Sequence, residues 1–458
     1  MGRLSGAVIR AAVLAIFLGS LVVSPVAAAD PTFGKPTIDT AFGRGVELTQ
    51  PVVLTATPFR VELLLTTGED GTPLVVEVPA PASGTTTLRY TLDVSDGHIL
   101  PNTPVTARWR ITPTPEADAV TGPPVSALYE DDRFEWQTIS GDVVRVHWYE
   151  GSRAFGERAL RIGEEAVAAT AALLGVTEDD KVDFFIYGDQ ASFYDALGPG
   201  TRENVGGQAN ADIRTLFALI APNEIDDPWV ATVVPHELVH LVFDTAVQNP
   251  YHFPPRWLNE GLAVYLSQGY EPGDRSAVER AARNGELLPL DGLAGQFPTT
   301  ADGFFLAYAE SVSAVDFFVR KHSEQALIDL IASYADGRTD DEAFTAAIGQ
   351  DVAAFNAAWL DDLGASAPVR YGPQPAPRGP QPSAWSADGG GGSATAVPGA
   401  TRPGGASPDT TAAPGSPGSG DGATGGGGVL LYVVAGLVVA GAAALVLARR
   451  RGRESVTP

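Results

Sequence analysis

Near its C-terminus the chain carries an uncharged, mostly apolar run from Val429 to Ala448. This run predicts that the protein is anchored in a membrane. The run has about the length that crosses the hydrocarbon core of a membrane, and a cluster of arginines follows it at once. Arginines directly after a span mark its cytoplasmic side. We therefore expect residues 429–448 to form a transmembrane helix and residues 449–458 a cytoplasmic basic tail.

The first 29 residues have the layout of a secretory signal peptide. Arg3 and Arg10 precede an apolar stretch from Ala11 to Val23, and small residues up to Ala29 follow it. This stretch is short for a membrane span, which favours cleavage over an uncleaved anchor. We expect residues 1–29 to be removed, leaving a single-pass protein of the cell membrane with an extracytoplasmic head and a cytoplasmic C-terminus.

Residues 369–428 consist mainly of Pro, Gly, Ser, Ala and Thr. Such a composition cannot bury enough apolar surface to fold, so it predicts a disordered stalk between head and membrane. The chain has no cysteine, which leaves His, Asp and Glu as ligands for any metal. The formal net charge of -25 is spread along the chain and argues against nucleic acid as a partner.

Residues 30–125 contain short β-rich runs separated by turn residues. Polar and apolar residues alternate within these runs, as a half-buried strand requires. Their spacing is typical of an immunoglobulin-like or fibronectin-like β-sandwich. The expected strands are Val46 to Thr55, Phe59 to Thr67, Leu74 to Val78, Thr85 to Val94 and Val105 to Thr112.

Residues 126–368 change in character along their length. The expected strands lie at 134–138, 143–149 and 182–187, and an Ala-rich helix is expected over 153–174. From Pro228 to about Leu363, nearly every segment has helical spacing. Strands followed by helices predict a mixed α+β domain that is large enough for a core of its own.

The helical part contains the run His236-Glu237-Leu238-Val239-His240. Two histidines four residues apart project from one face of a helix and can offer their imidazoles to a single metal ion. Glu237 lies beside them, close enough to take a proton from a metal-bound water. A solvated face carrying His and Glu is the alternative, but the surrounding residues make this helix too apolar to lie exposed.

A catalytic zinc usually has three protein ligands and one open position for water. Glu260 lies in an otherwise apolar helical segment and offers the third donor, with 19 residues between it and His240. Prolines at 250, 254 and 255 can turn the chain back between the two segments. A helix-loop-helix hairpin would bring Glu260 to the metal.

These motifs resemble those of the gluzincin metallopeptidases, a Peptidase MA-like group that includes thermolysin and the aminopeptidase N family. The resemblance rests on His236-Glu237-x-x-His240 followed by Asn259-Glu260-Gly261-x-Ala263, and it covers about residues 205–325. It implies a gluzincin-type peptidase domain in 126–368, with one Zn²⁺ held by His236, His240 and Glu260. It also implies that Glu237 is the catalytic general base.

The resemblance implies two further elements. In the aminopeptidase branch a tyrosine downstream of the glutamate ligand donates to the oxyanion. Tyr308, in Tyr308-Ala309-Glu310-Ser311, looks similar, with Tyr265 as an alternative and a core or capping tyrosine as the non-catalytic interpretation. Family members also place a strand along the substrate cleft. The candidate is Ile213 to Ile220, which fits an interior strand equally well.

The sequence also departs from the family pattern. It has no Gly-x-Met-x-Asn segment of the kind that holds a free amino terminus, so aminopeptidase action is not supported. Val264 stands where thermolysin has a carboxylate, and Asp244, one turn beyond His240, either orients a ligand or faces solvent. The remaining histidines considered, His147, His252 and His322, are expected to be structural or exposed.

We therefore expect a membrane-anchored, extracytoplasmic zinc metallopeptidase that cleaves peptide or protein substrates with a zinc-activated water. Two alternatives stay open. One is a non-catalytic surface binding or adhesion protein with a structural metal site, and the other is a zinc hydrolase of non-peptide bonds. The sequence leaves the oligomeric state open.

Overall fold

The structure, a computed structural model, describes residues 30–68, 71–94, 98–198, 206–249 and 251–368. The predicted signal peptide, stalk, transmembrane helix and basic tail lie outside these residues. The described chain forms two units that divide after Glu135, and a short segment from Tyr194 groups with the first unit.

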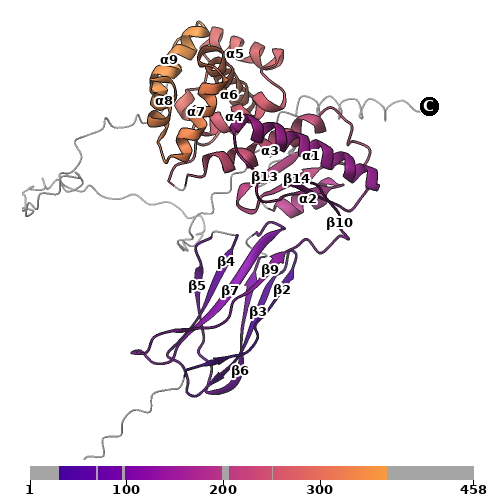
Figure 1. Cartoon of the computed structure of the whole chain (residues 1–458), viewed down its shortest axis with the longest axis vertical. Coiled ribbons are helices and arrows are strands. Elements are labelled where there is room, and N and C mark those ends of the chain that lie inside the picture. The colour runs from indigo at the N-terminus through magenta and orange to yellow at the C-terminus, as the bar shows by residue number, and fades with distance from the viewer. Residues whose placement is uncertain (1–29, 69–70, 95–97, 199–205, 250, 369–458) are drawn as a thin grey trace, which may run out of the picture. The chain divides into compact units, whose positions relative to one another are not determined.

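The first unit is built from two antiparallel sheets (Figure 1). Alternate residues of the long strands β3 and β7 are buried, so each sheet turns one apolar face inward. In one sheet β3 (Gly45–Leu54) pairs with β1 (Thr32–Phe33), β2 (Thr37–Ala41) and β6 (Gly84–Asp93). In the other, β4 (Arg60–Thr67) pairs with β5 (Leu74–Val78) and β7 (Thr103–Thr112), and β7 also pairs with β8 (Val120–Thr121) and β9 (Val125–Tyr129).

The five strands expected in this unit correspond to β3, β4, β5, β6 and β7. The predicted end of the unit at residue 125 is too early, because β9 pairs with β7 and the division lies at Glu135. The short β9 has too few alternating residues to be recognised from sequence. Two antiparallel sheets agree with the expected β module, while its immunoglobulin-like topology stays a prediction.

A mixed five-stranded sheet begins the second unit, in the order β10-β11-β12-β14-β13. Its three inner strands are parallel, and an antiparallel strand lies at each edge. The strands are β10 (Gln137–Ser140), β11 (Val144–Trp148), β12 (Val182–Tyr187), β13 (Gly207–Asn210) and β14 (Thr215–Leu219).

Of the two alternatives for Ile213 to Ile220, the edge strand is wrong and the interior strand is confirmed. This run contains β14, which lies between β12 and β13 and is hydrogen-bonded on both sides. The edge belongs to β13, which the preceding glycine-containing stretch forms. The apolar composition of β14 is that of an interior strand, because its residues are mostly buried on both faces of the sheet.

Helices dominate the rest of the second unit, so strands precede helices as expected for an α+β domain. Two short 3-10 turns, η1 (Ala211–Ile213) and η2 (Leu290–Leu293), lie between them. The helices are α1 (Arg153–Leu174), α2 (Gln190–Leu197), α3 (Val230–Val247), α4 (Arg256–Ser267), α5 (Pro272–Asn284), α6 (Ala301–His322), α7 (Glu324–Ala335), α8 (Asp340–Ile348) and α9 (Val352–Asp362). Helix α2 spans the division, because its residues from Tyr194 group with the first unit.

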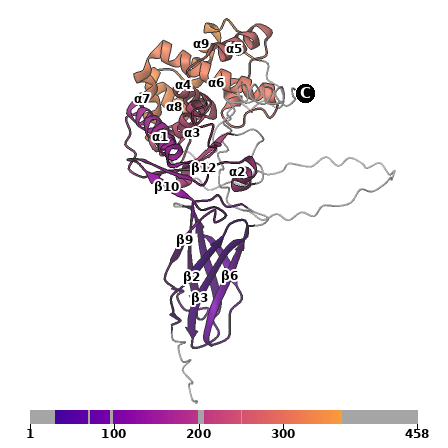
Figure 2. The same ribbon diagram turned by 90° about the vertical axis from the view of Figure 1, so that its right-hand side faces the viewer.

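Helices α1 and α3 lie side by side on one face of the mixed sheet (Figures 1 and 2). Trp148 of β11 and Gly207 of β13 belong to the same row of paired residues and therefore point to the same face. A Cβ at Gly156 of α1 would contact Trp148, and one at Gly207 would contact Val233 of α3. Small residues at these crossings let both helices pack close to the sheet.

Among the described helices, α3 is long and apolar enough to cross a membrane by length and composition alone. Of its apolar window, 72% is buried inside the structure, so α3 is a core helix of the second unit.

A glycine also allows α4 and α6 to cross closely. A Cβ on Gly261 of α4 would lie 2.4 Å from the backbone oxygen of Ser311 on α6, much closer than atoms pack. The neighbour Glu260 thereby lies near Tyr308, whose pKa is raised first by burial and then by the negative charge of Glu260. The sequence motif containing Gly261 is thus also a packing requirement.

The variant Gly261→Ala should separate these two helices. Although Ala favours a helix over Gly, overpacking against backbone should lower the free energy of unfolding by about 1–3 kcal/mol. Chemical denaturation of the full chain measures this change. Gly273→Ala in α5 is the control, because a Cβ there meets no atom within 4 Å. Equal losses in the two variants would contradict the packing argument.

Candidate metal centre

Helix α3 supplies both histidines and the glutamate between them. Exposed fractions are 1% for His236, 0% for Glu237 and 5% for His240. The helix is apolar on nearly all sides, so it packs inside the domain and takes its polar residues with it. Three buried polar side chains need partners, because an unsatisfied buried group costs free energy.

Glu260 of α4 completes a group of three converging donors. The Nε2 atoms of His236 and His240 lie 3.3 Å apart. The Oε2 atom of Glu260 lies 3.7 Å from the first nitrogen and 3.6 Å from the second. The sequence placed these residues in one site, and the structure brings them together.

The three donors fit a metal ion. Their ligand atoms all lie within 4.8 Å of one another, and all three residues are buried. Oε2 of Glu260 has no hydrogen-bond partner among the described residues, although it is buried. Two imidazoles and one carboxylate are a ligand set that zinc accepts, with a fourth position left for water or substrate.

Asn259 orients His240. Its side-chain oxygen lies 2.8 Å from Nδ1 of His240. An amide oxygen can only accept, so Nδ1 carries the proton and the lone pair of Nε2 faces the other donors. The Nδ1 atom of His236 has no corresponding partner among the described residues.

Asp244 does not take that orienting role. The charged groups that act on it are Asp212, Arg214 and Glu178, and burial is the largest effect, raising the pKa of Asp244 to about 6. The alternative of full exposure is also wrong, because the side chain is partly buried.

The surroundings of the site favour an ionised carboxylate at Glu260 and a neutral imidazole at His240. Burial alone would raise the pKa of Glu260, but its contacts with His236, His240 and Arg256 outweigh burial and lower that pKa to about 2. Burial lowers the pKa of His240 to about 4. An ionised carboxylate beside a neutral imidazole is the protonation state that metal binding requires.

Glu237 is held by the edge strand. Its Oε2 accepts a hydrogen bond of 3.0 Å from the backbone N–H of Ala209 in β13. Its Oε1 is buried without a hydrogen-bond partner among the described residues. Burial raises the pKa of Glu237 to about 7, against the opposing effect of His236. One oxygen is fixed and the other is left to exchange a proton.

Tyr308 of α6 lies at the same site. Its ring centre is 6.4 Å from that of His236. Burial, followed by the negative charge of Glu260, raises the pKa of Tyr308 well above its ordinary value, so the hydroxyl stays protonated. The alternative, Tyr265, lies in another charged environment, set by Asp316 and Glu324.

Histidines outside this site have partners of their own. His147 lies 2.7 Å from Asp183 through Nε2 and 3.0 Å from Thr138 through Nδ1. His252 lies 2.8 Å from Asp340. His322 is partly exposed and contacts the ring of Phe318. These positions agree with the expected structural or exposed roles.

Three contributors to the site were not predicted from the sequence: Ala209, Asn259 and Arg256. Asn259 stands inside the recognised motif, and its position next to Glu260 was the available signal. Arg256 precedes Glu260 by one helical turn, a spacing at which side chains meet. Ala209 acts through its backbone, so its side chain carries no signal.

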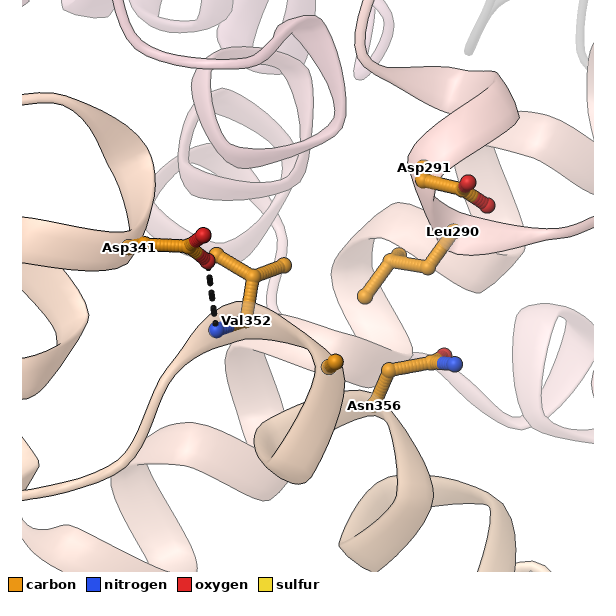
Figure 3. Close-up of a pocket in the computed structure, with 6 residues that line it drawn as sticks. Leu290, Asp291, Asp341, Val352 and Asn356 are labelled. Atoms are coloured by element: carbon orange, nitrogen blue, oxygen red, sulfur yellow. Dashed lines mark hydrogen bonds between the residues drawn. The ribbon is translucent and has the colours of Figure 1, made fainter. Parts of the chain in front are cut away.

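A separate hollow lies beside α8, α9 and η2 (Figure 3). Its volume is about 260 Å³, and its lining includes Asp291, Asp341 and Asn356 but none of the metal-site residues. Asp341 accepts a hydrogen bond from the backbone N–H of Val352 at the start of α9. Carboxylates disfavour an anion here and the helix N-terminus disfavours a cation, so the hollow lacks a coherent ligand preference.

Residues 162–365 match the family model of the Peptidase MA superfamily. The resemblance to this superfamily is confirmed. The matched Peptidase MA segment is a little under half of the chain and contains every residue of the metal site. No curated protein matches the sequence.

Solved structures give weaker similarities to the same group. An aminopeptidase N family protein from Idiomarina loihiensis has a TM-score of 0.39 and 11% identity, covering 68% of this chain and 72% of that one. An M1 zinc metallopeptidase from Deinococcus radiodurans has a TM-score of 0.36 and 14% identity, covering 74% of this chain and 94% of that one.

Asn259→Ala tests the orientation of His240 within the Peptidase MA segment. Loss of the acceptor frees the imidazole to change tautomer, so we expect zinc affinity to fall about 10–100-fold, the usual effect of removing such a partner. Competition with a chromophoric chelator measures the affinity. Asn284→Ala in the exposed end of α5 is the control and should bind zinc as the parent does. Unchanged affinity in Asn259→Ala would remove this role.

Proposed function

We propose that this chain is a membrane-anchored, extracytoplasmic zinc metallopeptidase that hydrolyses peptide bonds, with one Zn²⁺ per chain. The observation that carries the proposal is the convergence of His236, His240 and Glu260 beside Glu237, inside a Peptidase MA segment. His236, His240 and Glu260 would hold the zinc. When bound, zinc supplies a Lewis acid that polarises the scissile carbonyl and makes water a nucleophile near neutral pH.

Glu237 is the proposed general base. Its Oε2 is fixed by the N–H of Ala209, and its Oε1 has no hydrogen-bond partner among the described residues. The free oxygen accepts the proton of the attacking water and then passes it to the leaving amine. A bound cation nearby would lower the pKa of Glu237 from about 7 and favour the ionised form that accepts this proton.

Strand β13 is the proposed docking edge for the substrate backbone. The backbone oxygen of Gly206 accepts a hydrogen bond from the N–H of Leu219 in β14. Backbone groups point to alternate sides along a strand, so the N–H and C=O groups of Gly207 and Ala209 point away from β14. The hydrogen bond from Ala209 to Glu237 agrees with this direction. An extended peptide that pairs with such an edge passes beside the catalytic base, which favours peptides over non-peptide substrates.

Tyr308 is the proposed donor to the oxyanion of the tetrahedral intermediate. Its raised pKa keeps the hydroxyl protonated, and its ring lies next to His236. A donor aimed at developing negative charge stabilises the transition state more than the bound substrate.

The proposed location rests on the sequence. The predicted signal peptide, the predicted stalk and the predicted transmembrane helix with its following arginines support an extracytoplasmic head. Proteins or peptides outside the cytoplasmic membrane are then the substrates within reach. A surface binding protein with a structural metal is the main alternative. It gives no reason for a buried oxygen of Glu237 that has no hydrogen-bond partner among the described residues.

Glu237→Gln separates metal binding from catalysis. Gln keeps the size of the side chain but cannot accept the proton, so hydrolysis of a mixed peptide library by the full chain should fall at least about 100-fold. Zinc content, measured by atomic emission, should stay at one ion per chain.

Glu310→Gln is the matched control for this test. Glu310 is a fully buried carboxyl, and burial raises its pKa to about 8, but both its oxygens accept from the N–H of Leu288. The control should keep cleaving. If the parent binds zinc and cleaves no peptide, the proposed peptidase activity is rejected.

Tyr308→Phe tests the oxyanion role. The variant keeps the ring packing and removes one donor, so kcat should fall by about 10²–10³ while KM changes little. Steady-state kinetics on one cleaved peptide measures both constants. Tyr265→Phe is the control and should retain the parent kcat. If Tyr308→Phe raises KM and leaves kcat unchanged, Tyr308 packs against the substrate and does not stabilise the oxyanion.

A further inference from the structure

Arg256 is the first residue of α4 and lies four residues before Glu260. Residues at this spacing meet on one face of a helix. The backbone N–H of Arg256 donates to Ala294 at 2.9 Å, which fixes the start of the helix. Its side chain is only 18% exposed, so the guanidinium lies inside the domain rather than in solvent.

The guanidinium binds one oxygen of Glu260. Nε of Arg256 donates to Oε1 of Glu260 at 3.1 Å. The other oxygen, Oε2, is the one that faces the Nε2 atoms of His236 and His240, and it has no hydrogen-bond partner among the described residues. The two oxygens of one carboxylate therefore have separate surroundings, one cationic and one open to a metal.

An aromatic ring fixes the guanidinium from another side. Arg256 lies over Phe297, 4.6 Å from the ring centre, a distance typical of a cation–π contact. Phe297 in turn meets Tyr308 edge to face, with ring centres 5.3 Å apart and planes at 89°. Glu260 and Tyr308 are thus both connected to Arg256, directly in one case and through Phe297 in the other.

We propose that Arg256 is a positioning residue that makes Glu260 a single-oxygen metal ligand. The inference rests on the proposed metal site but not on peptide cleavage. A carboxylate without this partner can turn and bind a metal through both oxygens. The second oxygen would then take the position that a catalytic metal keeps for water or substrate. By holding Oε1, Arg256 keeps that position open.

Two variants of the full chain test the proposal. Arg256→Gln removes both the charge and the guanidinium geometry, whereas Arg256→Lys keeps the charge alone. With Co²⁺ in place of zinc, both variants should show weaker visible absorption than the parent, because absorption falls as the coordination number rises. In chelator competition both should bind zinc about 10–100-fold more weakly, as for other partners that orient a ligand.

A different pattern of zinc affinities would contradict the positioning role of Arg256. If Arg256 mainly repels the metal through its charge, Arg256→Gln will bind zinc more tightly and Arg256→Lys will match the parent. That result, or an unchanged Co²⁺ spectrum in both variants, would overturn the positioning role. Neither readout requires cleavage, so failure of the peptidase proposal would be visible separately, in a parent that binds zinc without hydrolysing peptides.

Controls exclude a general loss of structure. Arg275→Gln removes an arginine that likewise stacks on a ring, 4.2 Å from the centre of Tyr270, but belongs to α5 outside the site. It should leave both metal readouts unchanged. Phe297→Leu loosens Arg256 without removing it and should shift the Co²⁺ spectrum in the same direction by a smaller amount. This second variant decides the question if Arg256→Gln fails to fold.

Discussion

The rest of this site depends on the interactions that stabilise the buried carboxylate of Glu260. An ionised group that is only 1% exposed is costly unless opposite charges and donors surround it. Here one oxygen has a guanidinium and the other faces two imidazoles, and these contacts outweigh the effect of burial on the pKa. Helix α4 packs against both α3 and α6, and this packing encloses the carboxylate.

Close packing in turn depends on small residues at particular crossings. Gly261 lets α4 approach α6, and Gly207 lets β13 approach Glu237 on α3, where an added Cβ would lie 3.0 Å from its side chain. Gly261 directly follows Glu260, and Gly207 lies two residues before Ala209, whose N–H binds Glu237. A motif of this kind records packing and chemistry together.

The sequence predicted the parts of the structure whose cause is local. The strand pattern of the first unit, the apolar helix with His236 and His240, and the return of Glu260 after a proline-containing loop all follow from periodicity and spacing. The edge of the sheet could not be predicted, because β13 is four residues long and β14 reads as apolar whether it lies inside or at the edge. The contacts of Asn259 and Arg256 depend on the direction in which α4 crosses the site. The contact of Ala209 is made by its backbone N–H. The identity of a side chain indicates neither.

The hydrogen bond between Ala209 and Glu237 affects where along its length a bound peptide would be cleaved. The backbone amide of Ala209 joins β13, the proposed docking edge for a peptide, to Glu237, the proposed general base. Under the proposed function, this bond would hold a bound peptide at a fixed distance from the proposed general base. Backbone pairing ignores side-chain identity, and such a rigid frame would select where a chain is cut chiefly by register.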